Sequence, residues 1–107
     1  NWSDWGQIPT YETLYDNSSG ATGTITLTKS KNNFDYLEIY TDLGTIKTRA
    51  SDSECWATIS QCSDTLYINF LQLKLSGKSI TRGYTGVYYL NANHSTTFKV
   101  YKVLGYR

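Results

Sequence analysis

Apolar and polar residues alternate strictly in two segments of the chain, 23–28 (GTITLT) and 36–41 (YLEIYT). In the second segment, Leu37 and Ile39 point to one side, and the residues between them point to the other. A period of two is typical of β-strands with one face on a core and one face in water. Tyr and Thr dominate the solvent faces. Such faces suit contact with a neutral, hydroxyl-rich partner or a protein better than contact with a charged partner.

Short runs of this kind recur along the chain and are separated by turn residues. The pattern predicts strands at residues 11–15, 23–28, 36–41, 45–50, 55–61, 65–76, 80–84, 87–90 and 97–104. The connecting segments, such as DNSSGATG (16–23) and NANHS (91–95), are rich in turn-forming residues. No long run places apolar residues at helical spacing. We therefore predict an all-β fold, a jelly-roll-like β-sandwich of about eight or nine short antiparallel strands.

The apolar pattern of segment 65–76 changes phase partway along. Leu66, Ile68 and Phe70 share one side, whereas a second apolar set that begins at Leu71 lies one residue out of step. A slip of one residue turns every side chain to the opposite face. We therefore predict a β-bulge or a strand break near Phe70 and Leu71.

Size and charge narrow the classes of partner. The 107 residues suffice for one domain, which we predict at residues 10–107 after a lead-in at 1–9. The chain has no methionine, from which we expect either a fragment of a longer parent chain or a processed product. The net charge is +1 and the basic residues are scattered, so we expect no nucleic-acid partner. No apolar stretch approaches the roughly 20 residues of a membrane-spanning helix, so we expect no membrane insertion.

Cys55 and Cys62 lie seven positions apart in a segment that reads as extended. On one strand they would lie on opposite faces, about 23 Å apart at about 3.3 Å per residue, whereas a disulfide needs Cα atoms within about 7 Å. The segment between them has no Gly, Pro, Asn or Asp to build a turn, so we favour two reduced cysteines. One histidine and one cysteine pair do not make a zinc site, and we predict no metal or cofactor.

Residues suited to catalysis are few and dispersed. His94 is the single histidine and lies in a polar loop, whereas acid–base or metal chemistry would require a partner side chain. Asp52 and Glu54 resemble the carboxylate pair of a glycosidase, yet a polar loop between strands produces the same residues. We therefore predict that the protein is not an enzyme, and in particular not a polysaccharide depolymerase.

Two groups of residues are candidates for ligand binding. In the first, Trp56 supplies a flat ring for stacking on a sugar, and Arg49, Asp52 and Glu54 supply polar groups for its hydroxyls. The alternative is that Trp56 packs in the core at the start of a buried strand. The second group combines aromatic and polar side chains within residues 82–94: Arg82, Tyr84, Tyr88, Asn91, Asn93 and His94. The alternative for this group is a tyrosine-rich strand at a subunit interface.

Three stretches carry a resemblance to a known class of proteins. TLYDNSSGATGTITL (13–27), FDYLEIYT (34–41) and FKVYKVLGYR (98–107) resemble the C-terminal domains of bacteriophage virion proteins, chiefly tail-fibre, baseplate and minor structural proteins. The middle of the chain, at about residues 42–97, shows no such resemblance. The resemblance implies a homotrimer on the surface of the phage particle, facing the host cell.

We therefore carry two functional hypotheses forward. The first is a receptor-binding, adhesive domain that contacts host cell-surface glycan through shallow aromatic and polar pockets, each weak and multiplied by avidity in a trimer. The second is a purely structural module without a ligand, which trimerises the fibre or decorates a capsid. In the second hypothesis the outward Tyr and Thr rows form the subunit interface.

Overall fold

Nine β-strands and one 3-10 turn are present in the described part of the computed structural model, which comprises residues 10–62, 64–90, 92–94 and 98–107. The strands are β1 (Tyr11–Ala21), β2 (Ile25–Thr26), β3 (Tyr36–Thr41), β4 (Thr45–Arg49), β5 (Glu54–Cys62), β6 (Leu66–Ser76), β7 (Ser79–Tyr89), β8 (Ala92–His94) and β9 (Val100–Tyr106), and the 3-10 turn spans Lys31–Asn33. The all-β prediction is confirmed. The predicted lead-in at 1–9 lies outside the described residues.

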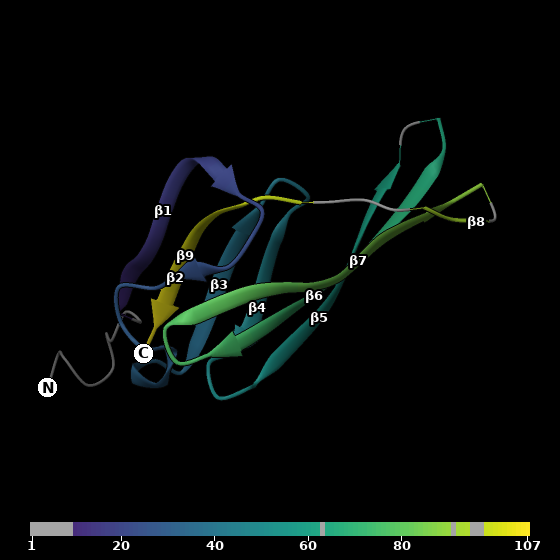
Figure 1. Ribbon diagram of the computed structural model, residues 1–107. Helices are drawn as coiled ribbons and strands as arrows, with labels where there is room; N and C mark the ends of the chain where they lie inside the picture. The colour runs from purple at the N-terminus through teal and green to yellow at the C-terminus, as the bar shows by residue number, and fades with distance from the viewer. Residues whose placement is uncertain (1–9, 63, 91, 95–97) are drawn as a thin grey trace, which may run out of the picture.

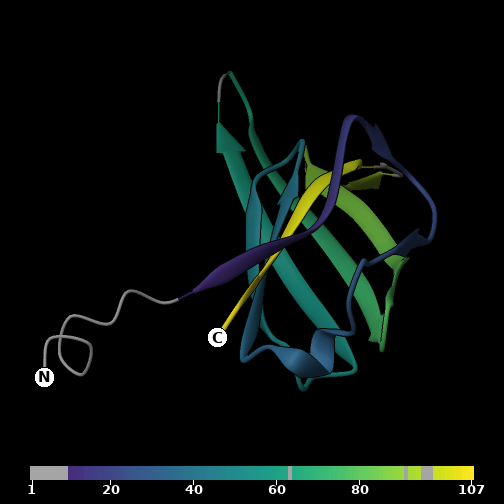
Figure 2. The same ribbon diagram turned by 90° about the vertical axis from the view of Figure 1, so that its left-hand side faces the viewer.

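The strands form two sheets that pack face to face (Figures 1 and 2). One sheet has the order β1-β9-β3-β4; the other has the order β2-β7-β6-β5, with β8 added to β7. Every strand pairing is antiparallel. The predicted β-sandwich is therefore confirmed.

The core between the sheets follows from the alternation in the sequence. Leu37 and Ile39 of β3 and Leu71 and Leu73 of β6 are completely buried, and they face one another's sheets as part of one hydrophobic cluster. Burying a side chain of this size stabilises the fold by about 1.5–3 kcal/mol. Phe98, which precedes β9, is also buried in this cluster.

Strand β6 is continuous, so the predicted strand break near Phe70 and Leu71 is wrong. Every second residue of β6 from Asn69 to Leu75 is buried, while Phe70 and Gln72 lie on the outer face. The two out-of-step apolar sets are therefore the two faces of one strand. A register shift does occur between Leu71 and Leu73, but the extra residue belongs to β7.

Several other strand boundaries differ from the prediction; for example, the strand predicted at 23–28 is only Ile25–Thr26. Segments 80–84 and 87–90, apart from Leu90, belong to the single strand β7, because Gly86 between them pairs with Phe70. Strand β1 continues through predicted turn residues to Ala21, with a register shift after Asp16. The predicted loop 91–95 contains β8, which pairs with β7. These segments are extended because each pairs with a neighbouring strand. The turn-forming residues of a segment do not show whether such a neighbour is present.

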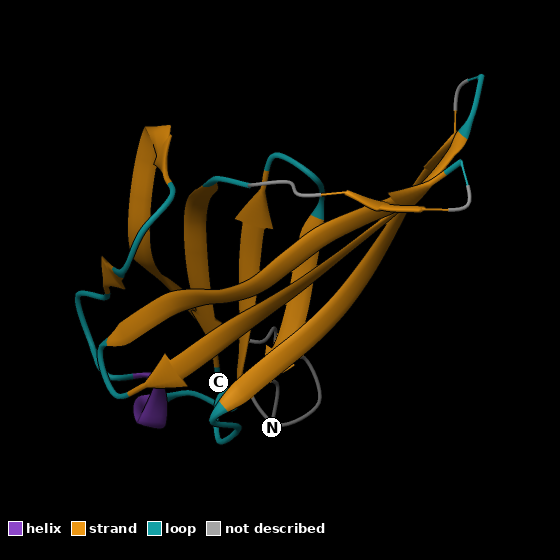
Figure 3. Cartoon of the chain, turned by 45° about the vertical axis from the view of Figure 1, so that its right-hand side comes forward, coloured by secondary structure: helices purple, strands orange, loops and turns teal. Residues whose placement is uncertain are grey.

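Strands β5, β6 and β7 run past the four-stranded sheet, and their far ends form a projection together with β8 (Figures 1 and 3). We call residues 60–62, 66–70, 85–90 and 92–94 the arm. The principal extents of 56 × 28 × 25 Å reflect this elongation. On the arm, Val87 is buried outside the main core cluster, and the Asn69 side-chain amide donates hydrogen bonds to Ile59 O and Gln61 Oε1 at 3.1 Å each.

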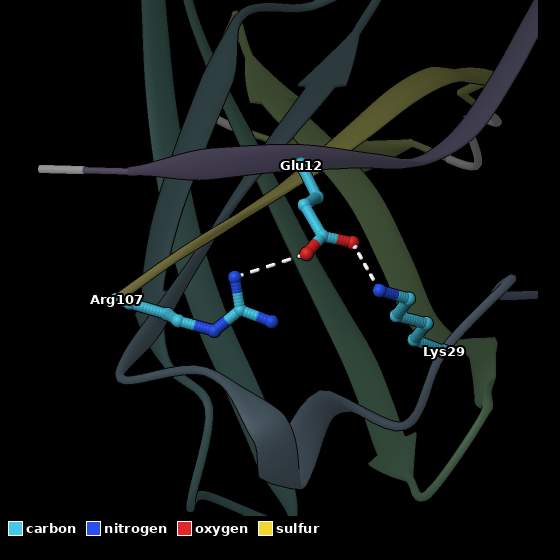
Figure 4. A network of polar contacts seen from close by, with 3 residues as sticks. All are labelled: Glu12, Lys29 and Arg107. Atoms are coloured by element: carbon cyan, nitrogen blue, oxygen red, sulfur yellow. Dashed lines mark ion pairs between the residues drawn. The ribbon is translucent and has the colours of Figure 1, made fainter.

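An ion-pair network joins the start of β1 to the residue that follows β9 (Figure 4). The Glu12 carboxylate lies 2.8 Å from Lys29 Nζ and 2.9 Å from Arg107 Nη1. Hydrogen bonds from Lys29 and Arg107 hold the pKa of Glu12 below its usual value. Arg107 also lies over the Phe34 ring, 4.6 Å from its centroid. These contacts fasten three segments that are distant in the sequence, although each exposed pair adds little stability by itself.

The two cysteines lie at opposite ends of β5 and on opposite faces. Cys55 is buried and Cys62 is exposed, and neither forms a disulfide. The segment between them is a regular strand, which is the geometry that argued against a disulfide. Burial raises the pKa of the Cys55 thiol.

We predict that Gly105→Ala destabilises the fold, whereas Gly23→Ala does not. A Cβ at position 105 would lie 2.7 Å from Phe34 Cγ and 2.9 Å from Leu14 Cδ1, whereas a Cβ at position 23 would meet nothing within 4 Å. Overpacking of this kind costs about 1–3 kcal/mol. Urea unfolding of both variants measures the difference, and equal midpoints would contradict the packing described for Gly105.

Candidate functional site

Three aromatic side chains gather on the outer face of the five-stranded sheet. Trp56 of β5 and Tyr84 of β7 are 59% and 60% exposed, with ring centroids 6.4 Å apart. Phe70 of β6 lies between the two strands and stacks on Tyr84 at 5.6 Å with an interplanar angle of 20°. We call Trp56, Phe70 and Tyr84 the aromatic platform. Exposed aromatic groups of this size are usually contact sites on soluble proteins.

Two polar side chains border the platform and are held in place by hydrogen bonds. Gln72 Nε2 donates to Glu54 Oε2 at 2.9 Å, and the Tyr84 backbone N–H donates to Gln72 Oε1 at 3.2 Å. Trp56 Nε1 donates to the other carboxylate oxygen of Glu54 at 3.4 Å. Glu54 and Gln72 therefore connect β5, β6 and β7 across the outer face. Each retains hydrogen-bonding capacity toward solvent, because a carboxylate accepts about four bonds and an amide nitrogen donates two.

The register shift in β7 and two glycines shape this surface. The extra residue removes the Tyr84 N–H from the regular ladder, and Gln72 supplies its acceptor. A Cβ at Gly83 would lie 2.5 Å from Gln72 Oε1, so only glycine leaves room for that side chain. The Phe70 ring covers Gly86, its cross-strand partner, where a Cβ would also clash. Glycine at positions 83 and 86 therefore leaves space for the side chains of Gln72 and Phe70.

The structure divides the first predicted group. Trp56 is an exposed residue on an outer face, so the core alternative does not hold, and it contacts Glu54 as predicted. Arg49 ends β4 in the other sheet, where it pairs with Tyr36. Asp52 is exposed in the turn before β5, and its backbone N–H donates to Arg49 O at 3.2 Å. Neither Arg49 nor Asp52 joins the platform.

The second predicted group is divided between two faces of β7. Tyr84 belongs to the platform, and Tyr88 is 40% exposed farther along the same face. His94 stacks on Tyr89, which lies on the opposite face, with ring centroids 3.9 Å apart. Arg82 is half-buried in β7 near the register shift. Asn91 lies outside the described residues, and the backbone of Asn93 pairs with Tyr88.

Sequence reasoning missed Gln72 and Phe70 as functional candidates. Gln72 stands between two buried leucines, which marks it as an outward residue of β6. Phe70 was assigned to an apolar set and therefore to the core. The contacts of both residues with Tyr84 depend on the pairing of β6 with β7, which no local pattern reports.

A second aromatic row crosses the outer face of the four-stranded sheet. Tyr106 of β9 stacks on Tyr36 of β3 at 4.8 Å, with an interplanar angle of 3°, and lies 5.5 Å from Tyr11 of β1. On the same face the Tyr40 hydroxyl donates to the Glu38 carboxylate. That hydrogen bond raises the pKa of Tyr40 to about 12, and burial raises the pKa of Tyr106.

The described residues hold no helix long and apolar enough to cross a membrane. Within the same part of the chain, no three His, Cys, Asp or Glu residues come together as a metal-binding group. What the platform offers is an aromatic contact surface with hydrogen-bonding groups at fixed positions.

No known protein family matches the chain in sequence, and no curated protein is similar to it.

We predict that Glu38→Gln lowers the pKa of Tyr40 from about 12 toward about 10, the usual value for tyrosine. The folded-state pKa is raised, so the Tyr40–Glu38 contact stabilises the fold below pH 10 and is lost as the pH rises through about 12. Tyrosine titration by NMR measures the change. Glu54→Gln, on the other sheet, is the matched control, and an unchanged Tyr40 titration in Glu38→Gln would contradict the assignment.

Proposed function

We propose that this chain is a non-enzymatic adhesion domain that contacts cell-surface glycan through the aromatic platform. The observation that carries the proposal is the pairing of two highly exposed aromatic rings, Trp56 and Tyr84, with the fixed polar groups of Glu54 and Gln72. An exposed tryptophan places a large apolar area in water, which is costly unless a partner covers it.

The geometry of the platform suits a sugar ring better than a purely apolar ligand. The apolar C–H face of a pyranose stacks on an aromatic ring, and its hydroxyl groups require donors and acceptors at the edge. Glu54 accepts from hydroxyls, and the amide group of Gln72 both donates and accepts. Since Gln72 is already hydrogen-bonded to Glu54 and to the Tyr84 backbone of β7, little side-chain entropy remains to be lost on binding.

The resemblance to bacteriophage virion proteins supports a location for this contact at the surface of a phage particle. The resembling segments 13–27, 34–41 and 98–107 include most of β1 and all of β2, β3 and β9. Strands β1, β9 and β3 are neighbours in one sheet. The segments that carry the resemblance therefore lie together in the structure. The platform is built from the middle of the chain. In this proposal a trimer multiplies the weak contacts by avidity.

We predict that Trp56→Ala and Tyr84→Ala each weaken binding to host envelope polysaccharide by at least about tenfold, which corresponds to about 1.4 kcal/mol. Each substitution removes a stacking surface without touching the core. Pull-down on purified envelope polysaccharide, followed by calorimetry with released oligosaccharides, measures the loss.

Tyr11→Ala is the matched control for these variants, because Tyr11 is 59% exposed but lies on the other sheet. It should bind as the unmodified protein does. Full binding by both platform variants, or no binding of the unmodified protein to any envelope fraction, would refute the proposed function.

A structural role in trimer assembly is a second candidate, and the arm is the observation that favours it. Leu66 and Leu90 at the arm are 53% and 72% exposed. Leu90 also has a φ of 51°, a left-handed conformation that bulky side chains rarely adopt. A strained, exposed leucine is costly in an isolated chain, and contact with a neighbouring copy would offset that cost.

We predict that Leu90→Asn weakens self-association without weakening the fold of the single chain. Asparagine tolerates the left-handed conformation, and it removes the apolar side chain at the arm. Sedimentation measures assembly, and thermal unfolding at low concentration measures the fold. Tyr36→Ala tests the alternative interface on the four-stranded sheet, and a strict monomer at all concentrations would contradict both interfaces.

A further inference from the structure

A shallow open depression lies on the outer face of the four-stranded sheet, which is the opposite side of the sandwich from the aromatic platform. Its volume is about 450 Å³, and it is lined by Tyr36, Lys47, Thr48 and Arg49. Tyr36 belongs to β3 and the other three residues to β4, so one antiparallel pair builds the whole depression. The glycan-contact proposal makes no use of it.

The walls of the depression combine positive charge with an aromatic ring. Lys47 and Arg49 are two positions apart on β4 and therefore point to the same face. Arg49 pairs directly with Tyr36 across the strands. Lys47 Nζ lies 5.3 Å from the centroid of the Tyr36 ring. The scattered basic residues of the sequence thus produce one local pair of cations beside a half-buried aromatic ring.

The carboxylate that faces Lys47 is engaged elsewhere. Glu38 is the cross-strand partner of Lys47, but it accepts the hydroxyl hydrogen of Tyr40. Among the residues that the structure describes, no carboxylate lies within ion-pair distance of Lys47 or Arg49. Both cations are therefore able to pair with a negative charge from outside the chain.

The Tyr36 ring in the depression is supported by a second aromatic ring. Tyr36 stacks in parallel on Tyr106 at 4.8 Å, and Tyr106 in turn contacts Tyr11. The Lys47 side chain is exposed and meets Tyr36 only through a cation–π contact. At an exposed site such a contact is weaker than a charge-assisted hydrogen bond to a carboxylate. An incoming anion can therefore draw the amine away and uncover the ring.

We propose that this depression is a second binding site, independent of the platform, for an acidic sugar residue. The carboxylate of a hexuronic acid pairs with Lys47 and Arg49, and the sugar ring takes the place of the Lys47 side chain on Tyr36. A long polyanion is a poorer fit, because the depression is lined by two cations and a polyanion is bound by many.

The test compares two forms of one ligand. An oligosaccharide of alternating glucuronic acid and N-acetylglucosamine is titrated calorimetrically against the unmodified protein, and so is the same oligosaccharide with its carboxyl groups reduced to alcohols. We expect the acidic form to bind about tenfold more tightly. Lys47→Gln and Arg49→Gln should each remove most of this preference, and raised ionic strength should reduce it. Lys78→Gln, an exposed lysine in the turn between β6 and β7, is the matched control.

A second measurement locates the bound ligand. Amide NMR shifts on addition of the acidic form should concentrate at Tyr36, Lys47 and Arg49 and leave Trp56 unchanged, which separates this site from the platform. Four results would overturn the inference: equal binding of the two forms, shifts centred on Trp56, a loss in Lys78→Gln as large as that in Lys47→Gln, or equally tight binding of inorganic polyphosphate at the same residues.

Discussion

The strict alternation along β6 is the constraint on which the rest of the structure depends. One uninterrupted strand presents Leu71, Leu73 and Leu75 to the core and Phe70 and Gln72 to the outer face. Both faces are occupied by side chains with definite partners, so a slip of one residue would bury Gln72 and expose three leucines at once. The register that fixes the core therefore also fixes the platform.

The two sheets are built largely from different parts of the chain. Strands β1, β9 and β3 lie side by side, and Glu12 of β1 forms ion pairs with Arg107, which follows β9, and with Lys29 (Figure 4). Strands β5 to β8 carry the platform and the arm, and all of them come from the middle of the chain. Such a division allows the outer face of one sheet to change its contacts while the other sheet and the shared core maintain the fold.

The sequence was sufficient for the fold class because the alternation of apolar residues is local. It predicted that Leu37 and Ile39 lie inside and that Cys55 and Cys62 lie on opposite faces. It was misleading at Phe70, because a strand with two apolar faces produces the same letters as a bulge. Gly86 indicated a break between two strands for a similar reason, since only its cross-strand partner, Phe70, explains it.

The candidate site could be predicted only in part. Trp56, Glu54 and Tyr84 were found as aromatic and polar residues, but they were placed in two separate groups. These residues come together on one face because β5 pairs with β6 and β6 pairs with β7. Those pairings are set by the whole fold. Arg49 was assigned to Trp56 by its nearness in sequence, whereas the turn between β4 and β5 carries the chain from one sheet to the other.

The most direct test of the central claim follows the N–H groups of the platform during a titration with oligosaccharides released from bacterial envelope polysaccharide. The Trp56 indole, the Gln72 side-chain amide and the Tyr84 backbone amide belong to one hydrogen-bonded unit with Glu54. The account predicts that their NMR signals move together, with a single dissociation constant, for at least one oligosaccharide. Saturable binding that leaves all three signals in place would contradict it.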